Sequence, residues 1–281
     1  MEKNRNLNTN NTYGFTIKEL FKTNPLSIVL VYLIIYIFGT LLISLIVSQI
    51  FASNNNMTLQ EVFKLGLQLD ESSEKNIKLY YTVQSYINFF SYMLLFIIVP
   101  IFGRGYLAKD AKAFTKFKFF LLILLEGLLF MLISKGLSEL SSLIITNMGY
   151  KDLTSQNENI IANMVKYGGK GLVVVSTILF APLVEELVYR KALMELTGRI
   201  SSKWQKKWVT ALFDIGISAL IFALPHMLSS NGYPVLVWIV LFLVYFLSGV
   251  MLASIYYFMK KNIYSSLLAH TLNNLFAVVN L

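Results

Sequence analysis

Long apolar runs, separated by short polar segments, make up most of the chain. The first run extends from Leu26 to Ile50 without a charged residue, and as a helix it is long enough to cross a hydrocarbon core of about 30 Å. Comparable runs cover residues 79–103, 119–134 and 171–196. The run at 119–134 should end in a helix break at Lys135. The pattern predicts four membrane-spanning helices in this part of the chain.

The last third of the chain predicts three more spans. Residues 215–259 contain no Asp, Glu, Lys or Arg, but a Ser-Ser-Asn-Gly-Tyr-Pro turn signal at 229–234 divides them into two helices. Residues 262–281 form the last apolar run. We therefore expect an all-α fold, a polytopic helical membrane protein with about seven transmembrane helices.

Composition supports this fold class and excludes several functions. Hydrophobic residues make up 56% of the chain and charged residues 14%, whereas about 25% is usual in soluble domains. The absence of cysteine excludes disulfides, thiol nucleophiles and thiolate metal sites. The net charge of +9 lies in short clusters between apolar runs, as in cytoplasmic loops, so we expect no nucleic-acid partner.

The distribution of basic residues predicts the topology. Seven spans with a cytoplasmic N-terminus place 17 of the 24 Lys and Arg residues on the cytoplasmic side, as the positive-inside rule requires. The chain then divides into a cytoplasmic polar tail at 1–25, three N-terminal spans within 26–148, and a four-span core at 168–281.

Two adjacent carboxylates and an arginine stand out in the fourth span. Ionisable groups inside a membrane cost roughly 2.5–3.5 kcal/mol each on insertion scales, so they persist mainly where they pair, line a cavity or do chemistry. On a helix Glu186 and Arg190 stand four residues apart and can form an ion pair, while Glu185 points about 100° away. The alternative is that all three lie at the cytoplasmic end of the span and reach water.

The two histidines of the chain also lie in apolar segments. His226 follows Pro225 and stands four residues after Phe222, whereas His270 shares one helix face with Asn274. Each of these residues alone is more often structural than catalytic. Glu126, in the third span, ranks below them, because a lone buried carboxyl is more often hydrogen-bonded or protonated.

The depths of these residues predict a surface helix. At 1.5 Å per residue, Glu185 and His270 both lie about 12 Å below the cytoplasmic face. His226 would lie at about 27 Å if span five began at Trp208, but at about 17 Å if the span began after Asp214. We therefore expect residues 201–213 to form a surface helix before span five.

Three short motifs occur in order within the last four spans. They are EExxxR at 185–190, FxxxH at 222–226 and HxxxN at 270–274. Together they resemble the CPBP family, the CAAX-protease and bacteriocin-processing intramembrane proteases also called Abi proteins, over roughly residues 170–281. The resemblance implies an intramembrane endopeptidase that hydrolyses a peptide bond of a small membrane-associated peptide or protein.

The resemblance also implies a role for each motif residue. Glu185 would activate the attacking water, and Asn274 would donate to the developing oxyanion. The two imidazoles would be those of His226 and His270. The positions that would support this site are Glu186, Arg190 and Phe222.

Two versions of the chemistry remain open. Glu185, His226 and His270 with an open fourth position would suit Zn²⁺, which lowers the pKa of bound water to about 7. The metal-free version uses Glu185 as a general base without any cofactor.

The expected partners are the lipid bilayer of a bacterial cell membrane and a peptide or membrane-protein substrate; the oligomeric state is open. One alternative is a non-catalytic immunity or regulatory membrane protein that binds a peptide or a sensor kinase. Another is a transporter with Glu126 and Glu185 in a proton relay.

Overall fold

A computed structural model describes residues 23–67, 73–112, 117–151, 153–228, 230 and 232–280, and over these ranges the chain forms helices and no strands. Six helices are long and apolar enough to cross a membrane, and α13 (Ile263–Val279) is a shorter apolar helix. The all-α polytopic fold is therefore confirmed. Most of the predicted polar tail at 1–25 lies outside the described residues. The six long helices are Pro25–Asn54, α5 (Glu74–Ala111), α6 (Phe117–Asn147), Lys170–Ser201, α11 (Lys207–Met227) and α12 (Val235–Phe258).

Two of these spans contain π-helical segments, in which hydrogen bonds skip one more residue than in an α-helix. The first span consists of α2 (Pro25–Ile34), η1 (Ile35–Gly39) and α3 (Thr40–Asn54). The fourth consists of α8 (Lys170–Val175), η3 (Ser176–Phe180), α9 (Ala181–Glu185), η4 (Glu186–Leu193) and α10 (Met194–Ser201). Between spans lie the short helices α4 (Leu59–Leu67) and α7 (Gln156–Tyr167).

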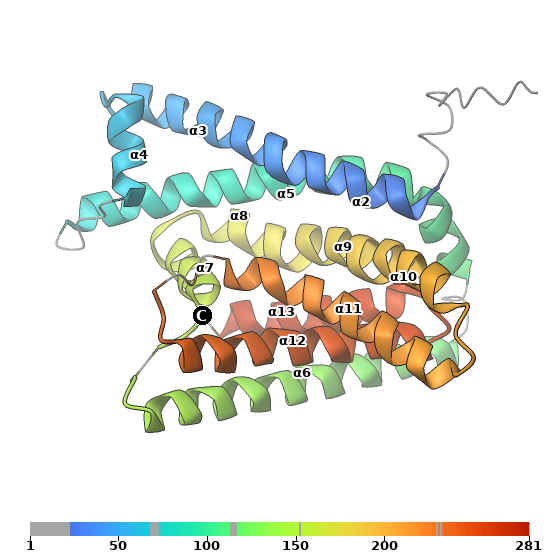
Figure 1. Ribbon diagram of the computed structural model, residues 1–281. Coiled ribbons are helices and arrows are strands. Elements are labelled where there is room, and N and C mark those ends of the chain that lie inside the picture. Colours follow the sequence, from blue (N-terminus) through green and yellow to red (C-terminus); the bar gives the residue numbers. More distant parts are fainter. Residues whose placement is uncertain are drawn as a thin grey trace, which may run out of the picture.

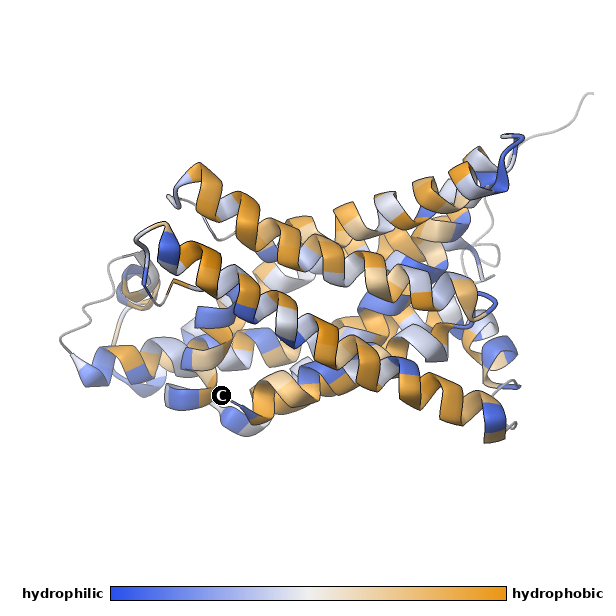
Figure 2. Ribbon diagram, turned by 90° about the horizontal axis from the view of Figure 1, so that it is seen from below, coloured by the Kyte–Doolittle hydropathy of each residue, from blue (hydrophilic) through white to orange (hydrophobic). Residues whose placement is uncertain are grey.

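Span four runs through the middle of the bundle. In Figure 1, α8, α9 and α10 lie between α5 on one side and α11 and α13 on the other, while α2 and α3 cover α5, and α6 lies along α12. More than half of the most apolar window of span four, 56%, is buried, against 33% or less in the other five long helices. Protein rather than lipid therefore surrounds four charged residues of this span, which are Glu185, Glu186, Arg190 and Lys191. Hydrophobic residues cover most of the length of the outer helices (Figure 2).

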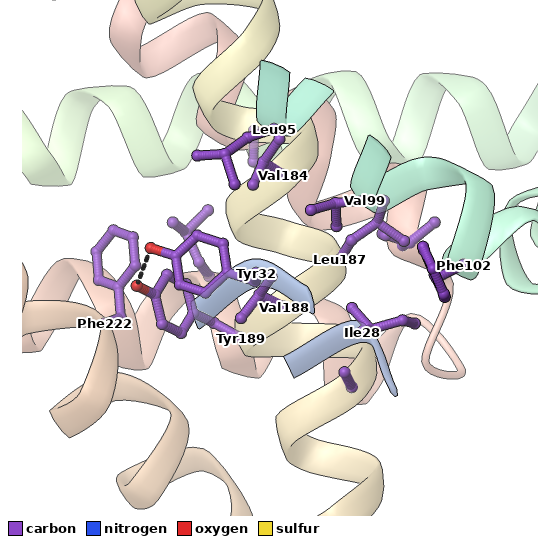
Figure 3. Close-up of a cluster of buried hydrophobic side chains, with 14 of the residues drawn as sticks. Ile28, Tyr32, Leu95, Val99, Phe102, Val184, Leu187, Val188, Tyr189 and Phe222 are labelled. Atoms are coloured by element: carbon purple, nitrogen blue, oxygen red, sulfur yellow. Dashed lines mark hydrogen bonds between the residues drawn. The ribbon is translucent and has the colours of Figure 1, made fainter. Parts of the chain in front are cut away.

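One hydrophobic core joins the early and late spans (Figure 3). Ile28 on α2 and Val99 on α5 pack in the same cluster as Leu187 of span four. The hydroxyl groups of Tyr32 and Tyr189 lie 3.2 Å apart within it. Span four is therefore packed against α5 and against α2, whose Tyr32 precedes Tyr189 by 157 positions.

The surface helix expected at 201–213 is not a separate element. Residues 207–213 form the first turns of α11, which continues unbroken to Met227. The expectation placed the start of the span after Asp214 because this start brings His226 closer to the depth of Glu185 and His270. The structure instead buries Asp214, and the hydroxyl of Ser201 donates to its carboxylate at 3.0 Å. Because the Asp214 carboxylate has a hydrogen-bond donor inside the fold, α11 can continue past this position.

The break expected at Lys135 is also absent. Helix α6 runs through this position to Asn147. Lys135 is exposed and forms an ion pair with Glu139 at 3.7 Å, one helical turn later. An exposed charged pair of this spacing is compatible with a continuous helix. Helices α11 and α12 are separate, as predicted, since α11 ends at Met227 and α12 begins at Val235.

Candidate active site

The imidazole of His270 lies between the two adjacent glutamates of span four. Its Nδ1 is 3.0 Å from Oε1 of Glu186, and its Nε2 is 3.8 Å from Oε2 of Glu185. All three side chains are at least nine-tenths buried. Glu185 and His270 therefore lie at a common depth, as expected from their positions along the two spans. Because both carboxylates are buried, the alternative in which they reach water at the end of the span is not what the structure shows.

The predicted ion pair of Glu186 and Arg190 is present. Nε of Arg190 lies 3.3 Å from Oε2 of Glu186, and both side chains are completely buried. The guanidinium also stacks over the ring of Phe222, 4.3 Å from its centroid. Glu186 thus contacts Arg190 and His270 together. Because a buried charge is costly without a partner, this shared carboxylate holds the cation and the imidazole in one place.

Glu185 has a partner that the sequence did not indicate. The hydroxyl of Tyr92, on α5, donates to Oε1 of Glu185 at 3.2 Å. The other oxygen, Oε2, is buried and has no hydrogen-bond partner among the described residues. Glu185 therefore keeps one oxygen bound and one oxygen open, and the open oxygen faces His270.

His226 contacts the ring of Phe222. Its Nδ1 is 2.9 Å from the carbonyl oxygen of Phe222, which leaves Nε2 for another partner. The Phe222 ring contacts both imidazoles, at 4.8 Å from the His226 ring and 5.8 Å from the His270 ring. The ring of Tyr245, on α12, stacks on His226 at 4.7 Å. The FxxxH motif thus provides one aromatic ring that contacts both histidines.

Asn274 ties α13 to the π-helical part of span four. In η3 the backbone N–H of Ala181 bonds to the carbonyl of Ser176, five residues back, and Pro182 has no N–H for the carbonyl of Thr177. The side-chain amide of Asn274 donates to this Thr177 carbonyl at 3.0 Å. An asparagine amide has two N–H donors, so one remains after this contact.

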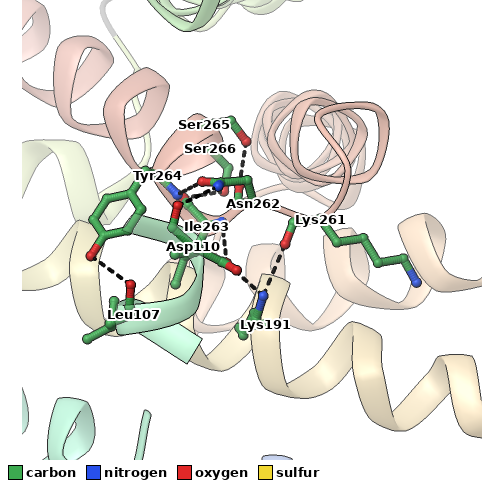
Figure 4. A network of polar contacts seen from close by, with 9 residues as sticks. All are labelled: Leu107, Asp110, Lys191, Lys261, Asn262, Ile263, Tyr264, Ser265 and Ser266. Atoms are coloured by element: carbon green, nitrogen blue, oxygen red, sulfur yellow. Dashed lines mark hydrogen bonds and ion pairs between the residues drawn. The ribbon is translucent and has the colours of Figure 1, made fainter. Parts of the chain in front are cut away.

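A buried polar cluster fixes the start of α13 (Figure 4). The carboxylate of Asp110, at the end of α5, accepts from Nζ of Lys191 at 2.7 Å and from the backbone N–H of Ile263 at 3.0 Å. Nζ of Lys191 also donates to the carbonyl of Lys261 at 3.0 Å. Asn262 caps α13 and donates to the Asp110 carbonyl. We call these four contacts the Asp110 clamp. It joins α5, span four and α13 two turns before His270.

The predicted metal ligands do not form a complete set. A catalytic zinc site uses three protein ligands and an open position. Among the described residues no group of three His, Asp or Glu side chains is placed to hold a metal ion. Glu185 and His270 converge, whereas the contacts of His226 are with Phe222 and Tyr245. The site as it stands therefore does not fit the three-ligand zinc arrangement.

Glu126 lies apart from these residues. It sits on α6, partly exposed, and its buried Oε2 has no hydrogen-bond partner in the described part of the chain. The next residue, Gly127, packs against the backbone of Ala269 on α13, where a Cβ atom would come within 3.3 Å of the Ala269 Cα. Position 127 therefore allows α6 and α13 to approach closely.

Comparison with known proteins gives one family. Residues 168–276 match the family model described as type II CAAX prenyl endopeptidase, Rce1-like. The match includes all three motifs and spans four to seven, and it leaves out α2, α5 and α6. No curated protein and no solved structure matches the chain.

Proposed function

We propose, because residues 168–276 match the model of the Rce1-like type II CAAX prenyl endopeptidase family, that the chain hydrolyses a peptide bond of a small membrane-associated peptide or protein. Membership in this family implies an intramembrane protease. The observation that carries the finer proposal is the contact of one imidazole, that of His270, with both glutamates of the EExxxR motif. The six long apolar helices support an integral membrane protein.

Glu185 acts as the general base in this proposal. A base must lie within hydrogen-bond reach of the proton it removes, and Oε2 of Glu185 is the oxygen without a partner. If Nδ1 of His270 donates its proton to Glu186, Nε2 carries a lone pair. Oε2 and Nε2 then present two acceptors to the two hydrogens of one water. Glu185 takes a proton as the water attacks the peptide carbonyl, and returns it to the leaving amine.

Asn274 serves the carbonyl oxygen. An amide N–H aimed at the developing oxyanion stabilises charge that appears only in the transition state. Asn274 has one N–H beyond the one bound to Thr177, and we assign it to the oxyanion. His226 takes no part in this contact, because its Nδ1 donates to the Phe222 carbonyl and Nε2 of the neutral imidazole is then an acceptor. No step in this mechanism uses a metal ion.

We also propose which end of the helix bundle faces the cytoplasm. The Asp110 clamp puts the end of α5 and the start of α13 at one end of the bundle, together with Lys191 and Lys261. Because basic residues favour the cytoplasmic side, we propose that this end faces the cytoplasm.

Peptide cleavage by the purified protein in liposomes tests the proposed function. A panel of quenched fluorogenic peptides with hydrophobic or lipid-modified ends would be compared for the wild type, Glu185→Gln and Glu139→Gln. Glu139 is an exposed carboxylate on α6, so its variant controls for the loss of a charge. We expect Glu185→Gln to lower the cleavage rate by roughly 10²–10⁴-fold and Glu139→Gln to leave it unchanged. Cleavage by Glu185→Gln at the wild-type rate, or no cleavage of any peptide by the wild type, would contradict the proposal.

A further inference from the structure

Helix α5 supplies a hydroxyl group to the proposed catalytic base. Tyr92 lies on a span that precedes the region matched to the family, and its hydroxyl donates to Oε1 of Glu185 at 3.2 Å. The two residues are 93 positions apart in the chain. The contact exists because α5 packs along the α9 segment of span four (Figure 1).

The hydrogen bond makes the two oxygens of Glu185 unequal. A carboxylate that is free to rotate would present either oxygen to a substrate. With Oε1 held by Tyr92, Oε2 is the oxygen that faces Nε2 of His270, at 3.8 Å. A base held at a defined distance and direction loses less orientational freedom when the reaction occurs.

The position of the hydroxyl is itself fixed by packing. The Tyr92 ring lies against the main hydrophobic core, next to the completely buried Leu95 and Val99 on the same helix. The far end of α5 is anchored by Asp110 through its contacts with Lys191 and Ile263. Tyr92 therefore lies on a helix that is packed against the core and anchored at its end.

We propose that Tyr92 is a positioning residue for the reaction, which selects Oε2 of Glu185 as the basic oxygen. The inference rests on the proposed function. It assigns part of the active site to a span outside the three motifs. Removal of the hydroxyl leaves the carboxylate in place but lets it rotate, so the chemical step slows while substrate binding is kept.

Steady-state kinetics of Tyr92→Phe test this proposal on the peptide that the wild type cleaves best. The matched control is Tyr86→Phe, on the same helix, where the ring is 36% exposed and packs on Phe51 and Phe90. Because a hydrogen bond to a charged group contributes about 1.5–3 kcal/mol, we expect kcat of Tyr92→Phe to fall about 10-fold or more, with KM within about twofold of the wild type. Tyr86→Phe should keep both constants.

Each outcome of the experiment decides the matter. An unchanged kcat in Tyr92→Phe would overturn the positioning role, and so would a raised KM with unchanged kcat, which would make Tyr92 a substrate-binding residue. In both cases the active wild type would leave the proposed function standing. A wild type that cleaves no peptide would overturn the proposed function, and this inference with it.

Discussion

Nδ1 of His270 lies 3.0 Å from a carboxylate oxygen of Glu186, although the two residues are 84 positions apart in the chain. The contact joins the HxxxN motif of α13 to the EExxxR motif of span four. It sets the direction of the imidazole, because Nδ1 is occupied and Nε2 must point away, toward Glu185. An imidazole oriented by a second carboxylate is a recurrent arrangement in hydrolytic sites. In the proposed mechanism Glu186 therefore positions the imidazole, while Glu185 acts as the base.

Glu186→Gln should destabilise the protein as well as inactivate it. The variant leaves the completely buried Arg190 without its ion-pair partner, and breaking a buried pair costs roughly 3–5 kcal/mol. Glu195→Gln is a matched control, because Glu195 pairs with Arg199 at the same spacing but on the surface, where such a pair contributes at most about 1 kcal/mol. Thermal unfolding of the detergent-solubilised variants measures the difference. Equal unfolding temperatures for the two variants would show that Arg190 finds another partner.

Lys191→Met should loosen the Asp110 clamp. The side chains of Lys191 and Asp110 are 9% and 8% exposed, so the loss of the cation leaves a nearly buried carboxylate with the Ile263 N–H as its remaining donor. We expect a loss of about 3 kcal/mol in the free energy of unfolding. The control Lys135→Met removes an exposed lysine and should cost less than about 1 kcal/mol. If both variants unfold alike, the clamp does not hold α13.

Metal chelation should leave peptide cleavage intact. In the described residues Glu185 and His270 converge without a third His, Asp or Glu ligand. We therefore expect the initial rate to be unchanged after incubation with 1,10-phenanthroline. Loss of activity with the chelator, and its recovery on addition of Zn²⁺, would instead support the metal version with His226 as a ligand.

Acid should weaken the start of α4, the short helix that follows the first span. The backbone N–H of Thr58 donates to the carboxylate of Glu61, and this hydrogen bond, together with one from the Thr58 hydroxyl, lowers the pKa of Glu61. A group whose pKa is lower in the folded state stabilises the fold above its ordinary pKa and loses that effect as the pH falls through the lowered value. Amide exchange of residues 58–67, corrected for intrinsic rates, should therefore lose protection in acid. Protection that stays the same from neutral to acid pH, or that is unchanged in Glu61→Ala, would contradict this.

Much of the fold could be predicted from the sequence because a membrane restricts the backbone to helices. Apolar run length located the spans, and the Gly-Tyr-Pro turn located the end of α11. The motif spacing predicted the pairing of Glu186 with Arg190, since four residues on a helix bring two side chains together.

The remaining parts of the site depend on contacts between distant segments. Tyr92 and Asp110 lie 93 and 81 positions from their partners in span four, and nothing in their local sequence marks them. The boundary expected at Asp214 failed for the same reason, since the satisfying hydroxyl of Ser201 comes from the preceding helix. At the π-helical segment η3, Pro182 has no N–H for the Thr177 carbonyl, and Asn274 of α13 donates to this carbonyl instead.

The most direct test of the central claim is hydrolysis in H₂¹⁸O, followed by mass spectrometry of both product peptides, for the wild type and Glu185→Gln. If Glu185 activates water for attack on the peptide carbonyl, the wild type will release two fragments. The fragment that has the new carboxyl group will carry one ¹⁸O atom from the water. Glu185→Gln will then form these fragments at least about 10²-fold more slowly. Fragments formed equally fast by the variant, or formed without ¹⁸O, would contradict the account.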